Sequence, residues 1–231
     1  MSEEPTQKPH REIKSFVLRQ GRLTTAQQNA LDNHWQDYGI DFSEQTLNFQ
    51  TLFNNDNEVL IEIGFGNGDS LLQQAITHPK TNFIGIEVHS PGVGHLIHHI
   101  HKEDLKNLKV IRHDAVEVLK QQIPANSIKQ LQLFFPDPWH KKKHNKRRIL
   151  NPRFIQLAQE KLKVGGLFHM ATDWQHYAEQ MLEQMDKAEG FLNTAGIGAY
   201  SDNTGERCET KFERRGIKLG HGVWDLIYQK S

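Results

Sequence analysis

From residue 58 onward, short apolar runs alternate with helical patterns, and this alternation restricts the possible folds more than any other feature of the sequence. The apolar runs predict six strands, at 58–63, 82–87, 108–112, 128–135, 166–172 and 223–228. The helical periodicity predicts helices at 24–38, 70–77, 93–102, 116–122, 152–163 and 174–187. Such alternation is typical of an α/β fold, in which a mostly parallel sheet carries helices on both faces. In a sheet of this kind the ligand site lies at the carboxyl ends of the strands.

The length of 231 residues suits one domain, and we expect residues 1–14 to form a flexible tail and residues 15–231 to form the domain. The longest apolar stretch is too short to cross a bilayer, and the polar start of the chain lacks the apolar segment of a secretory signal. Cys208 is the single cysteine, which suits a reducing compartment. These features predict a cytoplasmic protein without membrane contact. We expect a monomer, and the sequence leaves a dimer open.

A glycine-rich turn follows the first predicted strand, with glycines at alternating positions, Gly64, Gly66 and Gly68. Alternate glycines let the backbone turn sharply and approach a ligand closely. The dinucleotide motif G-x-G-x-x-G would need a glycine where this chain has Asp69, whose carboxylate would face the pyrophosphate. The Gly-Lys-Ser/Thr sequence of a phosphate loop is also missing after the turn. The turn therefore favours a cofactor without phosphate.

Acidic residues stand at three successive strand ends, namely Glu62, Glu87 and Asp114, the last followed by Ala115. S-adenosylmethionine has no phosphate and carries an ammonium and a sulfonium, so an acidic strand end such as Glu62 suits it. Glu87 could accept hydrogen bonds from both ribose hydroxyls, and Asp114 with Ala115 could meet the adenine edge. Each carboxylate alone could be an ordinary solvated strand end. Together with the glycine turn, the three predict an S-adenosylmethionine site.

The fourth predicted strand ends in the sequence Pro136-Asp137-Pro138-Trp139. The two prolines restrict Asp137 to extended geometry and so hold its carboxylate rigidly at the mouth of the sheet. Trp139 would offer a surface on which a base could stack. The alternative is a proline-stiffened turn with a tryptophan in the core.

Residues 141–148 read Lys-Lys-Lys-His-Asn-Lys-Arg-Arg, and six of these eight carry a fixed positive charge. The whole chain has 28 Lys and Arg residues and 28 Asp and Glu residues, so it has no overall excess of positive charge. The positive charge is instead concentrated in this run. Because the run directly follows the Pro-Asp-Pro-Trp turn, it predicts contact with an RNA backbone. The alternative is a solvated face.

Four histidines fall on one predicted helix and could suggest a metal site: His95, His98, His99 and His101. Their spacing is helical, and no cysteine or acidic partner is patterned around them. We therefore interpret them as surface or core histidines and expect no metal.

Seven segments resemble the bacterial tRNA (guanine-N7)-methyltransferase family and together span most of the chain: 15–22, 62–68, 85–92, 134–140, 143–148, 210–213 and 219–225. The segment Phe-Phe-Pro-Asp-Pro-Trp with its basic sequel is highly specific. The resemblance implies a Rossmann-like, S-adenosylmethionine-dependent methyltransferase fold with a C-terminal antiparallel strand. It also implies methylation of N7 of the guanosine at position 46, in the variable loop of tRNA.

The resemblance further implies roles for individual residues that match its motifs. The cofactor would meet Glu62, Glu87, Asp114 and Asp137, with Asp137 also catalytic. The substrate would meet Lys141, Asp173 and the segment Thr210, Lys211, Phe212 and Glu213. The RNA would meet Lys143, His144, Asn145, Lys146, Arg147 and Arg148. The chain departs from the family pattern at Arg207-Cys208-Glu209, where a proline is expected shortly before Thr210.

Three other functions are open at this point. The first is a methyltransferase for a base amino group or a small molecule; the basic run disfavours a small molecule, and the Pro-Asp-Pro-Trp order disfavours the amino group. The second is a non-catalytic RNA-binding protein on the same fold, which the intact glycine turn and acidic strand ends disfavour. The third, a nicotinamide dehydrogenase, is disfavoured by Asp69.

Overall fold

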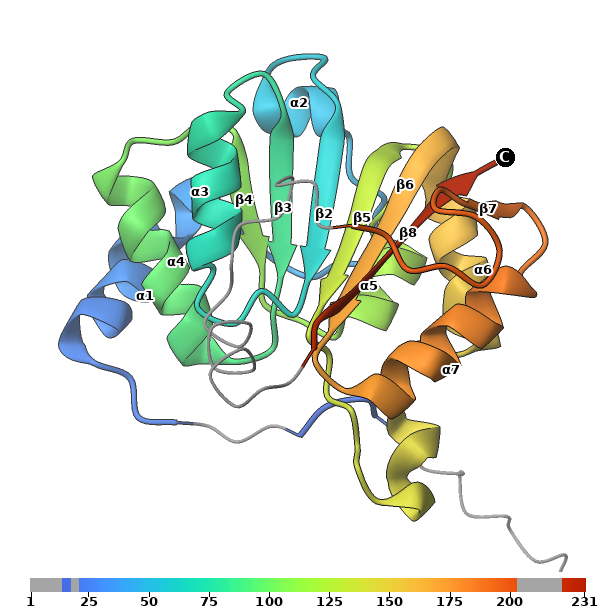
Figure 1. The fold of residues 1–231 in the computed structure, drawn as a ribbon. Helices are drawn as coiled ribbons and strands as arrows, with labels where there is room; N and C mark the ends of the chain where they lie inside the picture. The colour runs from blue at the N-terminus through green and yellow to red at the C-terminus, as the bar shows by residue number, and fades with distance from the viewer. Residues whose placement is uncertain (1–13, 18–20, 203–221) are drawn as a thin grey trace, which may run out of the picture.

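The computed structural model describes residues 14–17, 21–202 and 222–231, and its centre is an eight-stranded sheet of order β1-β4-β3-β2-β5-β6-β8-β7 (Figure 1). The strands are β1 (Gly39–Ile40), β2 (Val59–Ile63), β3 (Asn82–Ile86), β4 (Leu108–Ile111), β5 (Ile128–Phe134), β6 (Leu162–Thr172), β7 (Phe191–Asn193) and β8 (Trp224–Lys230). The helices are α1 (Thr25–Tyr38), α2 (Phe49–Phe53), α3 (Asp69–Thr77), α4 (Ser90–Lys102), α5 (Ala115–Gln121), the 3₁₀ helix η1 (Lys142–Arg147), α6 (Pro152–Lys161) and α7 (Gln175–Asp186). Within the described residues, no helix has both the length and the apolar character needed to cross a membrane.

The sheet is parallel from β1 to β6, and β8 runs antiparallel to both β6 and β7. Ile63 at the end of β2 pairs with Ile86 of β3 and with Leu133 of β5, so the carboxyl ends of these three strands meet at one edge. The chain builds β3 and β4 on one side of β2 and then crosses to β5 on the other side. This reversal is the topological switch point at which open α/β sheets bind ligands.

Two apolar clusters cover the two faces of the sheet. Residues of β2 alternate between them, because successive side chains of a strand point to opposite faces: Leu60 packs with the cluster of α1, α3 and α4, and Ile61 packs with that of α5, α6 and α7. All five residues of β2 and all five of β3 are buried, as expected for central strands covered on both sides. Because β2 and β3 are packed on both faces, the positions of their carboxyl ends are fixed by the core.

The six predicted strands and the antiparallel C-terminal strand are confirmed, with differences at the short elements. The predicted helix at 152–163 ends at Lys161, and β6 begins at Leu162 rather than at Gly166. Leu162 pairs with Ile128, and a bulge shifts the register before Gln130 pairs with Leu167. The elements β1, α2, β7 and η1 were not predicted, because two to six residues are too few to establish a period.

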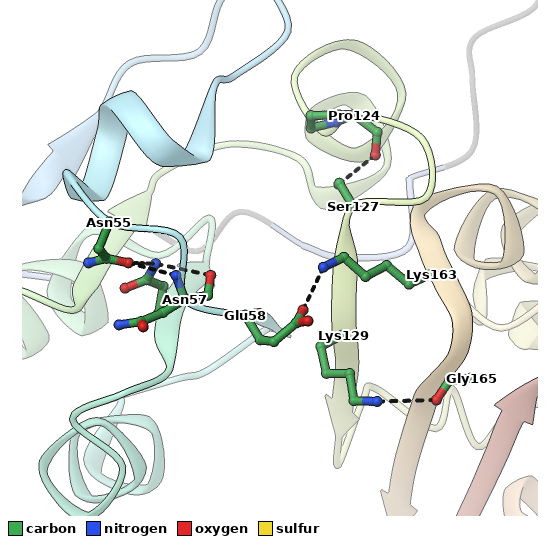
Figure 2. A network of polar contacts seen from close by, with 9 residues as sticks. Asn55, Asn57, Glu58, Pro124, Ser127, Lys129, Lys163 and Gly165 are labelled. Atoms are coloured by element: carbon green, nitrogen blue, oxygen red, sulfur yellow. Dashed lines mark hydrogen bonds and ion pairs between the residues drawn. The ribbon is translucent and has the colours of Figure 1, made fainter.

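The amino ends of the strands are joined by polar contacts, as Figure 2 shows. Lys163 at the start of β6 forms an ion pair of 2.7 Å with Glu58, which precedes β2. Asn82, the first residue of β3, is fully buried and donates from Nδ2 to Oδ1 of Asn55 at 2.8 Å. Lys129 of β5 donates to the carbonyl of Gly165 at 3.5 Å. Polar side chains at this edge therefore connect β6 with the residue before β2, β3 with the loop after α2, and β5 with β6.

Candidate active site

A cavity of about 450 Å³ lies at the opposite edge, among the residues that end or follow β2, β3, β4 and β5. The eight residues predicted to contact the cofactor all line it: Glu62, Gly64, Gly66, Gly68, Glu87, Asp114, Ala115 and Asp137. They come from four separate parts of the sequence and are brought together because parallel strands end at the same edge.

The glycine turn forms an open cradle on one side of this cavity. Gly64 has φ +72° and Gly66 has φ +60°, a left-handed conformation that favours glycine. A Cβ atom added to either residue would have no described atom within 4 Å, so it would project into open space on the cavity side. The left-handed backbone accounts for glycine at both positions, and the absence of side chains leaves this side of the cavity open.

Glu87 ties the glycine turn to the end of β3. Its Oε2 accepts a hydrogen bond from the backbone N–H of Gly66 at 3.0 Å. Its Oε1 accepts from the N–H groups of Val88 and His89 at 2.6 and 3.0 Å. Three backbone donors fix the carboxylate in one orientation at the cavity wall, with further lone pairs on the same oxygens for a ligand.

Glu62 is buried at the end of β2, with 4% of its surface exposed. Within the described residues its Oε2 has no hydrogen-bond partner. Burial, together with the nearby charge of Glu87, raises the pKa of Glu62 to about 8. An unpartnered buried carboxyl on a cavity wall fits a cationic ligand group, because such a group would supply both the missing hydrogen bond and a compensating charge.

Asp114 is the N-cap residue directly before α5 and lies on the cavity wall. Its Oδ1 accepts from the N–H of Val116 at 3.0 Å, which caps the helix. Its Oδ2 lies 3.4 Å from Nζ of Lys14, in the N-terminal segment. Asp114 therefore has a structural task beside the predicted cofactor contact.

Asp137 is exposed between Pro136 and Pro138, and the backbone on both sides is strained. Phe135 has φ +49° and Trp139 has φ +46°, and both are bulky residues in the left-handed region. Such conformations are costly and cluster at functional sites. The two prolines restrict the backbone at Asp137, which is one of the residues that line the cavity.

The prediction that Trp139 offers a free surface for a base is wrong for one face of the ring. The guanidinium of Arg147 lies 3.8 Å from the ring centroid. The indole Nε1 donates to the carbonyl of Ser15 at 3.1 Å. Trp139 is therefore half-buried in contacts within the protein.

The basic run divides into an exposed part and a buried part. Lys141, Lys142, Lys143 and Lys146 are exposed, and Arg147 is half-buried. Arg148 is only 2% exposed, and its Nε donates to the carbonyl of Pro138 at 2.8 Å. Arg148, which was predicted to contact RNA, uses its guanidinium within the protein: it also stacks 4.5 Å over the ring of Tyr177 and bonds Gln180. Of the rest of the run, His144 is half-buried, and Asn145 Oδ1 is buried without a partner among the described residues.

Comparison with known proteins decides the family. A family model described as "Putative methyltransferase" matches residues 56–226. The tRNA (guanine-N(7)-)-methyltransferase of Yersinia enterocolitica is 54% identical over 221 residues, covering 96% of this chain and 92% of the relative. The protein of the same name from Alcanivorax borkumensis is 54% identical over 225 residues, covering 97% and 94%. The chain belongs to the tRNA (guanine-N(7)-)-methyltransferase family.

Solved structures show that this family member has the fold of other methyltransferases. The 16S rRNA methyltransferase KamB has a TM-score of 0.59 at 15% identity, covering 79% of this chain and 92% of that one. The precorrin-6y C5,15-methyltransferase of Geobacter metallireducens has a TM-score of 0.52 at 12% identity, covering 77% and 81%. The predicted Rossmann-like methyltransferase fold is confirmed.

Two residues of this chain that were predicted to contact the substrate, Lys141 and Asp173, do not line the cavity. Lys141 is exposed directly before η1. Asp173 lines a second hollow, of about 580 Å³, with Trp174, Glu179 and Trp224 among its walls. The segment Thr210, Lys211, Phe212 and Glu213 and the departure at Cys208 lie outside the described residues, so their predicted roles stay predictions.

Sequence reasoning assigned no role to the N-terminal segment, yet Ser15 and Phe16 line the cavity. The sequence indicated their importance only through the resemblance of segment 15–22 to the family. The two residues themselves do not indicate which distant element they contact. Among the described residues, no group of three His, Cys, Asp or Glu side chains is arranged to hold a metal ion. His95 instead bonds the carbonyl of Asn67 at 2.9 Å, and His101 stacks on His34 at 3.6 Å.

Proposed function

We propose that this protein methylates N7 of a guanosine in tRNA, at position 46 of the variable loop, with S-adenosylmethionine as the methyl donor. The observation that carries the proposal is the meeting of the acidic strand ends, the open glycine cradle and the rigid Asp137 around one cavity. The names of the relatives, which are more than 50% identical over nearly the whole chain, support tRNA as substrate and guanine N7 as the acceptor.

The residues present fit the proposed cofactor. The unpartnered carboxyl of Glu62 would bind its ammonium, and Glu87 would accept from its ribose hydroxyls. Asp114 and Ala115 would border the adenine. When bound, S-adenosylmethionine supplies a methyl group on a positively charged sulfur, from which a nucleophile can remove it.

The protein's task at the acceptor is mainly orientation. Guanine N7 carries a lone pair in the ring plane and no proton, so no base is needed to prepare it for attack. The purine gains a positive charge as N7 is methylated, and a fixed carboxylate near the acceptor stabilises that charge. Asp137 lines the cavity, is exposed to a ligand and stands between two prolines that restrict its backbone, so it is the side chain we assign to this task.

The tRNA would be held around this position by two groups of residues. The exposed lysines 141, 142, 143 and 146 would meet phosphates, since each presents its charge at the surface of the described part of the protein. Asp173 and the segment Thr210 to Glu213 would meet the acceptor nucleotide. A carboxylate in that role would accept hydrogen bonds from the guanine N1–H and amino group.

Nucleoside analysis tests the proposed function. The protein is incubated with methyl-labelled S-adenosylmethionine and an unmodified tRNA transcript, and the digested nucleosides are separated by chromatography against standards of the methylguanosine isomers, which share one mass. We expect the label in 7-methylguanosine, and no label when guanosine 46 of the transcript is replaced by adenosine. Label on a base amino group would support the alternative methyltransferase, and tRNA binding without any transfer would support a non-catalytic RNA-binding protein.

A further inference from the structure

A short N-terminal segment, Lys14–Val17, forms part of the cavity wall although it lies far from the other wall residues in sequence. In Figure 1 it is the short blue stretch that passes below the arrowheads of β2 and β5. Ser15 and Phe16 line the cavity, and Phe16 is half-buried. The segment contains no described helix or strand, so side chains from elsewhere must hold it.

Two side chains from the Pro-Asp-Pro-Trp turn and the basic run hold this segment by its backbone. Arg147 donates from Nε to the carbonyl of Lys14 at 3.1 Å and from a terminal nitrogen to the carbonyl of Phe16 at 3.0 Å. Trp139 donates to the carbonyl of Ser15, which lies between those two. Three successive carbonyls are thus bound by an arginine and a tryptophan that also stack on each other.

We propose that Arg147 is a positioning residue for cofactor binding, which acts by fixing Phe16 as a wall of the cavity. A wall that is ordered before the ligand arrives saves the entropy that ordering it on binding would cost. The ion pair between Lys14 and Asp114 fixes the other side of the same segment to the cavity. This inference rests on the proposed assignment of the cavity to S-adenosylmethionine.

The competing role for Arg147 is a phosphate contact, like that of its neighbour Lys146. The two roles differ in what they require of the side chain. A phosphate contact needs a positive charge, which lysine also supplies. Holding two carbonyls two residues apart needs the planar fork of the guanidinium, which lysine lacks.

The substitution Arg147→Lys therefore separates the two roles in the full-length protein. We expect the Kd for S-adenosylmethionine, measured by equilibrium dialysis, to rise by up to about tenfold, which corresponds to ordering the wall when the cofactor binds. The affinity for tRNA without cofactor should stay that of the wild type. Arg153→Lys, an exposed arginine on α6, is the matched control and should change neither affinity. A wild-type cofactor Kd in Arg147→Lys would overturn the proposal.

Phe16→Ala tests the same inference at the wall itself and does not depend on the folding of the arginine variant. It should raise the cofactor Kd, and the double variant with Arg147→Lys should be no weaker than the weaker single variant, because both remove the same wall. Additive losses would overturn the proposal. A third variant, Glu87→Ala, tests whether the cofactor binds in this cavity at all. If Glu87→Ala weakens cofactor binding and the variants at Arg147 and Phe16 do not, the cavity assignment holds and only the proposed role of Arg147 is wrong.

Discussion

The two edges of the parallel sheet differ in how their acidic side chains are used. At the amino edge, polar side chains bond one another, as Lys163 does with Glu58 and Asn82 with Asn55, and the one unpartnered atom of that set is the neutral Oδ1 of Asn82 among the described residues. At the carboxyl edge, Glu62 keeps an unpartnered oxygen among the described residues, and Phe135 precedes Asp137 in a left-handed conformation. A buried carboxyl without a partner and bulky residues in the left-handed region are costly, and such features cluster at functional sites. The contrast predicts that substitutions at the carboxyl edge change binding and rate, and those at the amino edge change only stability.

The largest effect is expected for Asp137→Asn, which keeps the shape of the side chain and removes its charge. Methyl transfer should slow by roughly 10²–10³, equivalent to about 2.7–4 kcal/mol for a lost electrostatic contact in the transition state. The unfolding transition and the affinity for tRNA should be unchanged, because the side chain is exposed. Single-turnover rates with saturating cofactor measure this change.

The pH dependence of that variant distinguishes charge stabilisation from a general-base role. If Asp137 acted as a base on the guanine N1 proton, the residual rate would climb steeply with pH and recover fully. Charge stabilisation predicts a rate that stays low across the range. An Asp137→Asn variant with the wild-type rate would contradict both roles. It would also mean that this substitution at the carboxyl edge has no more effect on rate than one at the amino edge.

A dependence of cofactor affinity on pH is expected from Glu62. Its pKa of about 8 means that the carboxyl is protonated at neutral pH, whereas an ion pair with an ammonium needs the carboxylate. Binding below pH 8 should therefore release a proton, and affinity should rise by about tenfold per pH unit between pH 6 and pH 7. Calorimetry in buffers of different ionisation enthalpy measures that proton. Glu62→Gln should abolish the release, while Glu58→Gln at the amino edge should leave it unchanged.

The division of the basic run predicts which charges tRNA binding uses. Four exposed lysines give a slope of log affinity against log salt of about −3 with the single-strand coefficient. Replacing Lys142, Lys143 and Lys146 by alanine should make that slope shallower by about 2, and cofactor affinity should not change. Arg148→Ala should leave the slope as it is and lower the free energy of unfolding, since this side chain is buried. An equal change of slope in both variants would mean that burial does not decide which charges meet RNA.

The smallest effect is expected at the amino edge. The side chains of Glu58 and Lys163 are 52% and 41% exposed, so Glu58→Ala should lower the free energy of unfolding by at most about 1 kcal/mol. Chemical denaturation measures this loss. The rate of methyl transfer and both affinities should match the wild type, and a loss of activity without a loss of stability would break the contrast between the edges.

Much of the fold could be predicted because its central strands are long, apolar and bounded by clear turns. The positions of the residues proposed to bind the cofactor followed from the same pattern, since a residue that ends a parallel strand must lie at the carboxyl edge. Glu62, Glu87 and Asp114 needed no knowledge of tertiary contacts for this reason. Short elements such as β1 have too few residues to show any period.

The contacts of the basic run could not be predicted, because they depend on which distant groups face each side chain. Arg147 and Arg148 read in sequence like the lysines beside them. In the structure Arg147 binds the N-terminal segment, and Arg148 lies under α7 against Tyr177. Trp139 was misjudged for the same reason, since its ring face is covered by an arginine from the adjacent helix η1.

The most direct test of the assignment of the carboxyl edge to the cofactor is the Kd of S-adenosylmethionine for Glu87→Ala, compared with Glu58→Ala as the matched substitution at the amino edge. We expect Glu87→Ala to weaken cofactor binding on the order of tenfold or more, as for lost hydrogen bonds to a charged group, with tRNA affinity barely changed. Glu58→Ala should bind both ligands like the wild type. An unchanged cofactor Kd in Glu87→Ala, or equal losses for cofactor and tRNA, would contradict the placement of the cofactor in this cavity.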